Sequence, residues 1–119
     1  MKIAIPSSGT DLNAPVDARF GRAKYFLVYD TDSKETTIVE NLQNLNAPQG
    51  AGIQAAQAVV QAGPKVLLAG NCGPKAFAVL NQAGVKVFLV QSGTVQQALD
   101  DYANGRLKEA ESANVEGHW

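Results

Sequence analysis

The sequence has almost none of the residues that hold metal ions, disulfides or catalytic triads. Cys72 is the only cysteine and His118 the only histidine among 119 residues, so no disulfide can form within the chain. A lone cysteine cannot supply the four protein ligands of a conventional iron–sulfur cluster or of a structural zinc ion. A single histidine next to the C-terminus gives no basis for a Ser–His–Asp triad. A metal centre built only from protein ligands is therefore not expected.

An excess of basic charge and long apolar runs are lacking as well. Ten basic side chains face eleven acidic ones, so the basic excess typical of a general nucleic-acid-binding protein is missing. No apolar run approaches the ~20 residues needed to cross a bilayer. The opening apolar run, Met1–Pro6, is too short for a signal peptide. We therefore expect a cytoplasmic protein with neither a nucleic-acid nor a membrane partner.

The residues that are present suit one compact α/β domain. Hydrophobic residues make up 45% of the chain, and its length is typical of a single core. We expect a domain over residues 1–107 and a flexible polar tail over residues 108–119. Apolar runs predict strands, and helical periodicity bounded by Gly and Pro predicts helices. The predicted strands cover residues 2–6, 25–30, 36–41, 66–69 and 85–90, and the predicted helices cover residues 53–63, 74–84 and 94–105.

Two of the helices carry further signals. Ile53, Ala56 and Val60 fall on one face of the first helix, which predicts that this face is buried. Thr94 and Gln97 have the spacing of a capping box, which predicts the start of the third helix.

The order of these elements predicts a five-stranded mixed sheet. A hairpin joins the second and third strands, and βα units join the first, fourth and fifth strands in parallel. The expected strand order is 3-2-1-4-5, with the second strand antiparallel. In such sheets ligands bind beyond the carboxyl ends of the strands, where the chain order reverses. Two unusual segments, residues 7–22 and 70–74, follow the strands on either side of that point.

The shorter of these segments has the composition of an anion site. Its glycines allow a close backbone approach, and the following helix offers free amides and a partial positive charge. Lys75 adds a full charge in the first helical turn, where a bound anion would offset its unfavourable position. The candidate binding residues here are Gly70, Asn71, Cys72, Gly73 and Lys75. The alternative is an ordinary strand-to-helix turn.

The longer segment contributes a basic loop. Three cations lie within six residues around a glycine, and arginine forks suit oxyanions and anionic sulfides alike. The candidate binding residues are Ser7, Ser8, Arg19, Phe20, Gly21, Arg22 and Lys24. A solvated loop balanced by neighbouring aspartates is the alternative. Cys72 is either a small half-buried hydrophobe or a single metal contact with a pKa lowered by the helix N-terminus. His118 is either a tail residue or a cluster ligand.

The sequence resembles the dinitrogenase iron–molybdenum cofactor-binding family. The resemblance covers residues 1–105 and lies mainly in two blocks, Val-Asp-Ala-Arg-Phe-Gly-Arg-Ala at residues 16–23 and Leu-Ala-Gly-Asn-Cys-Gly-Pro-Lys-Ala-Phe at residues 68–77. It implies a ribonuclease H-like three-layer fold and a non-enzymatic carrier of a preassembled anionic metal–sulfide cluster. A molybdenum–copper sulfide cluster is the first choice that the resemblance implies, and an iron–molybdenum cofactor-type cluster is the second. The donor or acceptor of the cluster is not indicated.

The sequence also bears on two functions other than that of a carrier. A nuclease of the ribonuclease H type needs several carboxylates around metal ions, and the first strand, Lys-Ile-Ala-Ile at residues 2–5, has none. A regulatory or interaction module could use the same loops to bind a phosphate or another anionic metabolite. This second alternative stays open on the sequence alone.

Overall fold

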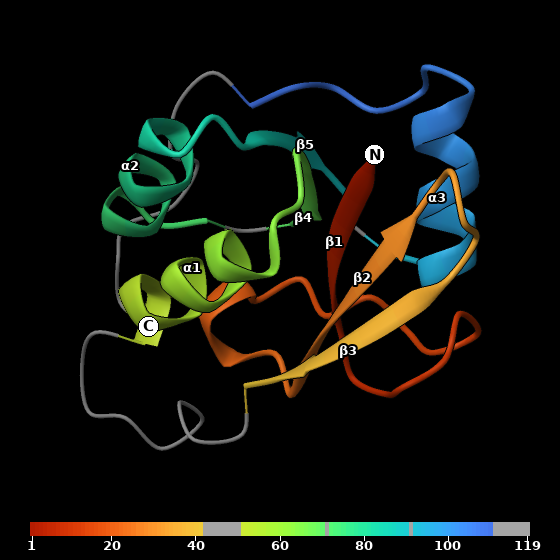
Figure 1. Cartoon of the computed structure of the whole chain (residues 1–119), viewed down its shortest axis with the longest axis horizontal. Helices are drawn as coiled ribbons and strands as arrows, with labels where there is room; N and C mark the ends of the chain where they lie inside the picture. Colours follow the sequence, from red (N-terminus) through yellow and green to blue (C-terminus); the bar gives the residue numbers. More distant parts are fainter. Residues whose placement is uncertain (42–50, 71, 91, 111–119) are drawn as a thin grey trace.

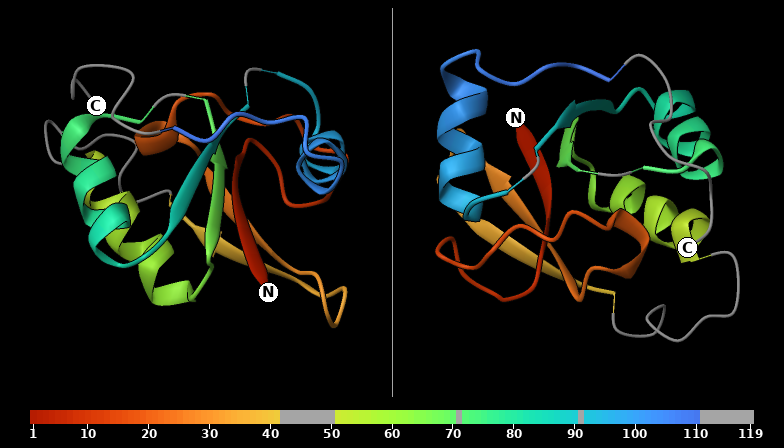
Figure 2. Two further views of the ribbon diagram at one scale, coloured as in Figure 1. Left: turned by 90° about the horizontal axis from the view of Figure 1, so that it is seen from above. Right: turned by 180° about the vertical axis from the view of Figure 1, so that it is seen from behind.

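The computed structural model describes residues 1–41, 51–70, 72–90 and 92–110, and it forms three layers. The strands are β1 (Lys2–Ser7), β2 (Tyr25–Asp30), β3 (Thr36–Glu40), β4 (Val66–Ala69) and β5 (Lys86–Leu89). The helices are α1 (Ala51–Ala62), α2 (Pro74–Gln82) and α3 (Val95–Ala103), and a 3-10 turn, η1, spans Phe20–Arg22. Helices α1 and α2 cover one face of the sheet and α3 covers the other (Figures 1 and 2).

The sheet has the predicted order, β3-β2-β1-β4-β5. Strand β1 pairs with β2 in antiparallel register and with β4 in parallel register. Strand β5 continues the parallel side, and the β2–β3 hairpin forms the other side. The predicted α/β class, the mixed sheet and the antiparallel second strand are all confirmed. The chain order reverses between β1 and β4, as expected.

The sheet buries a separate apolar layer on each face. Phe26, Leu67 and Leu80 belong to the layer beneath α1 and α2, whereas Ile5, Leu27 and Leu68 belong to the layer beneath α3. Successive residues of a strand point to opposite faces, so Phe26 and Leu27 lie in different layers. Both faces of the central strands are therefore closed, and the exposed edge at the carboxyl ends is left for the loops.

The buried face of α1 differs in part from the predicted one. Ala51, Ala55 and Val59 are buried, whereas Ile53 and Val60 are only half-buried. The helix begins two residues before the predicted start at Ile53, and small residues spaced four apart form its inner row. Ala55 and Val59 belong to the apolar layer on this face of the sheet, whereas the larger Ile53 lies at the margin. Ala56, which was predicted on the inner face, is fully buried, and Val60 packs against the same apolar layer, so the predicted face is confirmed only in part.

The signals predicted for the other helices are confirmed. The Thr94 hydroxyl accepts from the Gln97 amide at 3.1 Å, and the Gln97 side chain accepts from the Thr94 amide at 2.9 Å, which completes the capping box. Pro74 lies in the first turn of α2, where the missing N–H of a proline removes no helical bond. Gly84 follows α2 with a φ of 79°, in the region that favours glycine.

The chain after α3 returns along β5, which corrects the predicted boundary of the tail. The amide of Leu89 donates to the carbonyl of Lys108 at 2.9 Å, and the amide of Ala110 donates to the carbonyl of Val87 at 2.8 Å. Residues 108–110, which were expected in a flexible tail, therefore pair with the edge strand. Residues 111–119, including His118, lie outside the described residues. Within the described part of the chain, no helix is long and apolar enough to span a membrane.

Candidate functional site

The long segment after β1 is held across the carboxyl edge of the sheet by backbone bonds. The amide of Asp17 donates to the carbonyl of Pro6 at 3.0 Å, and the amide of Val16 donates to the carbonyl of Gly93 at 2.9 Å. Ser7 and Val16 also form an isolated antiparallel bridge. The segment therefore runs back along the end of β1 and joins the loop between β5 and α3. Its irregular sequence has a fixed backbone path.

The two predicted binding segments touch at Gly70, the first residue after β4. A Cβ atom placed on Gly70 would lie 2.9 Å from the Cβ atom of Ala18 and 2.8 Å from the carbonyl oxygen of Val90. Both distances are shorter than real Cβ contacts. Gly70 is therefore required because the loops after β1 and β5 pack directly against it. The sequence suggested room for a ligand at this glycine, and the structure shows that neighbouring protein takes that room.

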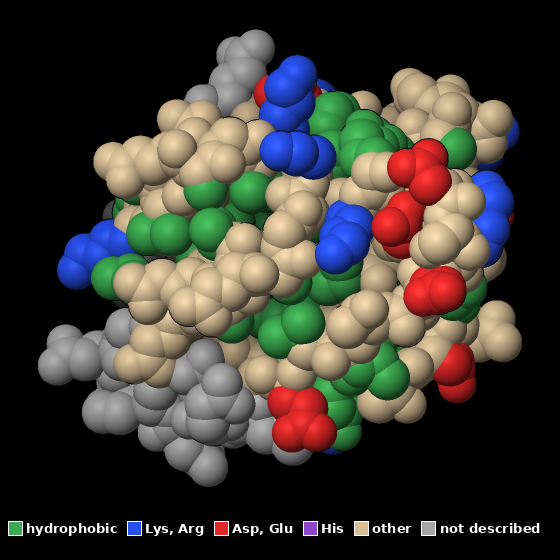
Figure 3. Space-filling model, viewed as in Figure 1, with side chains coloured by type: hydrophobic (Ala, Val, Ile, Leu, Met, Phe, Trp, Pro, Cys, Tyr) green, Lys and Arg blue, Asp and Glu red, His purple; other side chains and the backbone are tan. Residues whose placement is uncertain are grey.

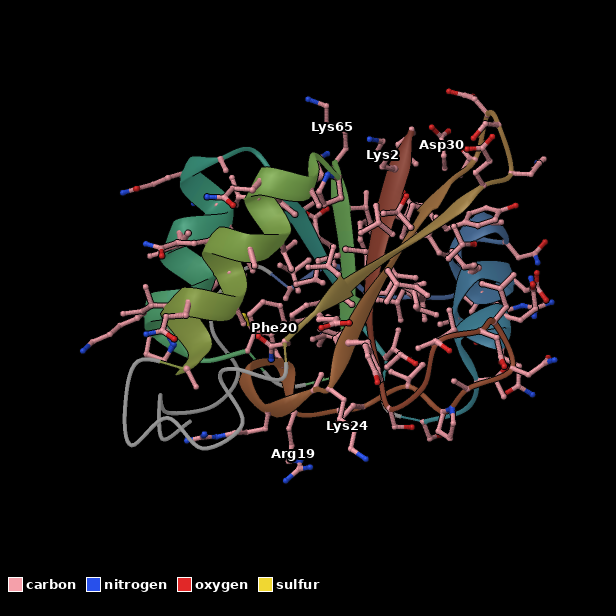
Figure 4. The ribbon with its side chains drawn as sticks, turned by 60° about the horizontal axis from the view of Figure 1, so that its bottom comes forward. Lys2, Arg19, Phe20, Lys24, Asp30 and Lys65 are labelled. Carbon is pink, nitrogen blue, oxygen red and sulfur yellow. The ribbon has the colours of Figure 1, made fainter. Side chains whose placement is uncertain are left out.

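Phe20 and Gly21 anchor the basic loop in the core. Phe20 is fully buried, with its ring centroid 5.2 Å from that of Phe26. It lies beside α1 (Figure 4), and η1 packs against that helix. Its ring, predicted to contact a ligand, is closed off from solvent in this structure. The anchor fixes the residues on either side of it, which are the cations Arg19 and Arg22.

Arg19 and Lys24 project from the same edge of the molecule, away from the sheet (Figure 4). Two-thirds of the Arg19 side chain is exposed, and its Nε atom lies 3.6 Å from Asp17 Oδ1. Asp17 Oδ1 also accepts from the Arg19 amide at 2.9 Å, so it orders the entry into the loop. Arg22 is half-buried and Lys24 is exposed. This edge therefore presents cations on a backbone whose position is fixed.

The start of α2 contributes groups of a different kind. Gly73 at the N-cap has no side chain to accept from the first-turn amides, which carry the partial positive charge of the helix. Lys75 is exposed in that turn and forms no ion pair with other described residues. Asn71, also predicted here, lies outside the described residues. The turn supplies amides and one cation, as its sequence suggested.

Cys72 is buried beneath this turn and does not have the lowered pKa that its position predicted. It is 2% exposed and belongs to the apolar layer that also contains Phe20 and Ala76. Burial raises the pKa of the Cys72 thiol to about 12, because the thiolate would lose its hydration. Desolvation by the surrounding side chains is the cause of this shift. The thiol is protonated at neutral pH, and no group of three or more His, Cys, Asp or Glu side chains among the described residues could hold a metal ion.

The two serines support the loop in different ways. Ser7 is fully buried, and its hydroxyl donates to the Gly9 carbonyl at 2.8 Å and accepts from the Gly9 amide at 3.1 Å. Ser8 is exposed, and its hydroxyl lies 3.4 Å from the Pro15 carbonyl that its amide also contacts. Only Ser8 is placed where a ligand could reach it without a change in the turn.

The sequence interpretation did not identify Asn41, which is fully buried at the end of β3 and bonds to the basic loop. The residue type indicates the end of the strand, because asparagine is common directly after an apolar strand. Nothing in the local sequence, however, connected it with residues 19–24. That connection depends on the antiparallel return of β3 alongside β2.

The fold defines the class of the protein: a three-layer α/β domain whose candidate site lies at the topological switch point between β1 and β4. The dinitrogenase iron-molybdenum cofactor family model matches residues 1–105, and the chain belongs to that family. The resemblance noted in the sequence is thereby confirmed. Because the family is described by a cofactor, membership points to cofactor binding rather than catalysis.

The chain is also similar to two solved structures and to a curated relative. The apo form of the orange protein from Desulfovibrio gigas is 39% identical, with a TM-score of 0.92 and 96% of each chain covered. A putative NifB protein from Thermotoga is 43% identical, with a TM-score of 0.85 and 98% of each chain covered. An uncharacterized protein from Methanocaldococcus jannaschii is 26% identical over 93% of this chain and 92% of its own.

Proposed function

We propose that this protein binds and carries a preassembled anionic metal–sulfide cluster and is not an enzyme. The observation that carries the proposal is the contact of the two predicted segments at Gly70 and Ala18, which unites the basic loop and the start of α2 at the switch point. Cations, helix amides and a fixed backbone suit a ligand that arrives complete and negatively charged. The family and the similarity to the orange protein support the same class of ligand.

The state of Cys72 favours binding through charge and hydrogen bonds. A protonated, buried thiol is a poor ligand, since metals bind the thiolate. A cluster that brings its own sulfide ligands needs no protein thiolate, and arginine, lysine and amide donors can hold its outer sulfur atoms. We propose a molybdenum–copper sulfide cluster as the cargo, with an iron–molybdenum cofactor-type cluster as the second candidate. The protein that delivers or receives it is not identified.

The direct test is a titration of the apo-protein with tetrathiomolybdate, with and without copper(I), followed by visible absorbance. We expect saturable binding at micromolar protein that weakens as salt rises, because charge contributes to the affinity. Metal analysis of protein purified without oxygen should show molybdenum, with copper if the mixed cluster is the natural cargo. Absence of any bound chromophore in both experiments would contradict the proposal.

A regulatory module that binds a phosphate or another anionic metabolite is the competing function, because the same cations and amides suit an oxyanion. Competition separates the two. Inorganic phosphate at millimolar concentration should not displace tetrathiomolybdate if the site is built for the larger anionic sulfide. Displacement at that concentration would favour the metabolite module.

A further inference from the structure

Asn41 is a buried amide that lies against the cationic loop. It follows β3 directly and is fully buried. Its Nδ2 atom donates to the carbonyl of Ala23 at 2.8 Å and to the carbonyl of Gly21 at 3.4 Å. Its backbone amide donates to the carbonyl of Lys24 at 2.9 Å. A single residue from the end of the hairpin therefore bonds to three of the four residues from Gly21 to Lys24.

The chemistry of these bonds requires an amide side chain. The NH₂ group of asparagine has two donor hydrogens, and the two carbonyl oxygens accept them. An aspartate would place an acceptor against two acceptors, and an apolar residue would leave both buried carbonyls without this donor. The partners lie 18 and 20 residues earlier in the chain. The bonds therefore join β3 to the basic loop, and local turn chemistry cannot replace them.

The same bonds affect the electrostatics of the loop. Carbonyl oxygens repel an anion, and those of Gly21 and Ala23 bond to a side chain in the interior. Lys24, whose own carbonyl is also held by Asn41, extends its ammonium group to the outside next to Arg19 (Figure 4). The loop thus has its backbone acceptors engaged on the inner side and its cations on the outer side. Phe20 fixes the start of the loop and Asn41 fixes its end.

We propose that Asn41 is a positioning residue for the anion site, which it serves by holding residues 21–24 in the conformation that presents the cations. It acts through the loop and does not itself contact the ligand. This inference rests on the proposed function of the loop as part of an anion-binding site.

The test compares two variants that weaken packing in different places. Asn41→Leu removes both N–H donors of the side chain, keeps a similar volume and adds no charge. If Asn41→Leu does not fold, Asn41→Ser, whose hydroxyl keeps one donor, is used in its place. The matched control is Val66→Ala, which opens a cavity in the layer beneath α3. Val66 follows Lys65, at the sheet edge opposite Arg19 and Lys24 (Figure 4). Each variant is titrated with tetrathiomolybdate at a temperature where circular dichroism shows it folded.

We expect the Asn41 variant to bind tetrathiomolybdate about tenfold more weakly than the parent. A factor of this size corresponds to the loss of well-placed bonds between the loop and a charged ligand. The Val66→Ala control should bind like the parent even though its melting temperature falls. Amide hydrogen exchange without ligand should accelerate over residues 19–24 in the Asn41 variant and not in the control.

A double-mutant cycle supplies a readout that general destabilisation would not change. If Asn41 acts by placing Lys24, then Lys24→Ala should reduce affinity less in the Asn41 variant than in the parent, since the two changes are coupled. Parent-like affinity in the Asn41 variant, or fully additive effects, would overturn the positioning role. If the parent itself binds no tetrathiomolybdate, the proposed function has failed. The exchange data then show separately whether Asn41 holds the loop.

Discussion

The two ends of the parallel strands both carry cations, but the cations are held in different ways. At the amino end, Lys2 and Lys65 lie near the chain terminus, whose amine is 2.8 Å from Asp32 Oδ2 and 3.7 Å from Asp30 Oδ1 (Figure 4). These are exposed ion pairs, which stabilise little. Acidic side chains also gather over α3 and the β2–β3 turn (Figure 3).

At the carboxyl end, the ion pair of Arg19 with Asp17 is accompanied by buried contacts that hold the loop. Phe20 and Asn41 fix the basic loop, Gly70 joins it to the turn before α2, and uncapped helix amides lie in that turn. The comparison teaches that the number of lysines and arginines does not define the candidate site. What distinguishes it is a loop backbone held by buried contacts, which would lower the ordering cost of binding an anion there. The following predictions test that difference.

The largest expected effect is a loss of stability of the apo-protein at high pH caused by Cys72. Its pKa is about 12 in the folded protein against 9.0 for a free thiol, so between these values the unfolded chain has lost a proton that the folded chain keeps. The contribution of the protonated thiol to the free energy of unfolding is complete below pH 9.0 and is lost as the pH rises toward about 12. The slope of this loss approaches about 1.4 kcal/mol per pH unit. Denaturant unfolding of the parent at a series of pH values between about 8 and about 11 measures this loss of stability.

The control for this prediction is Cys72→Ala, which removes the thiol from the same place. Lysines and tyrosines titrate over the same pH range in both proteins, so only the difference between the two slopes belongs to Cys72. The parent should lose stability more steeply than the variant. Equal slopes would show that the thiol is not desolvated in solution and that the turn before α2 is open.

The second prediction concerns the contact between the two binding segments. Gly70→Ala should lower the free energy of unfolding by about 1–3 kcal/mol, as overpacking does in well-packed interiors, because its Cβ would meet Ala18 and Val90. Tetrathiomolybdate affinity should fall with it. Adding Ala18→Gly removes the Cβ atom of Ala18, one of the three opposing atoms, and should restore part of the lost stability. If Gly70→Ala is as stable as the parent, the loops do not meet as described.

Features that depend on residues close together in the sequence were predicted better than features that depend on distant contacts. The strand 25–30, the turn with Pro74 and the capping box of Thr94 depend on neighbours in the chain, and all were predicted correctly. Strand order also followed, because right-handed βα units and a hairpin leave few topologies. The buried face of α1 was predicted only in part, because Ala56 is buried as expected, whereas Ile53 and Val60 are only half-buried.

The candidate site was only half predictable for the same reason. Composition located the two segments, since glycines and clustered cations are local features. The roles of individual residues depend on contacts between distant parts of the chain. Phe20 is an anchor because α1 and β2 enclose it, Cys72 is neutral because the apolar layer covers it, and Asn41 matters because β3 returns beside the loop. Neighbouring residues left two interpretations open for Cys72, of which burial was one, and they gave no indication of the burial of Phe20 or of the bonds of Asn41.

The smallest expected effect comes from a matched pair of lysines at the two edges. Lys24 and Lys65 are both exposed, and neither forms an ion pair with another described residue, so Lys24→Ala and Lys65→Ala remove the same charge in similar surroundings. Each should change the free energy of unfolding by less than about 0.5 kcal/mol. Lys24→Ala should weaken tetrathiomolybdate binding roughly threefold, the scale of one exposed charge contact, whereas Lys65→Ala should leave it unchanged. Titrations at low and high salt measure both, and the difference between the variants should shrink as salt screens the charge. If the two variants lose affinity equally, the anion responds to net charge alone, and the carboxyl edge has no special role.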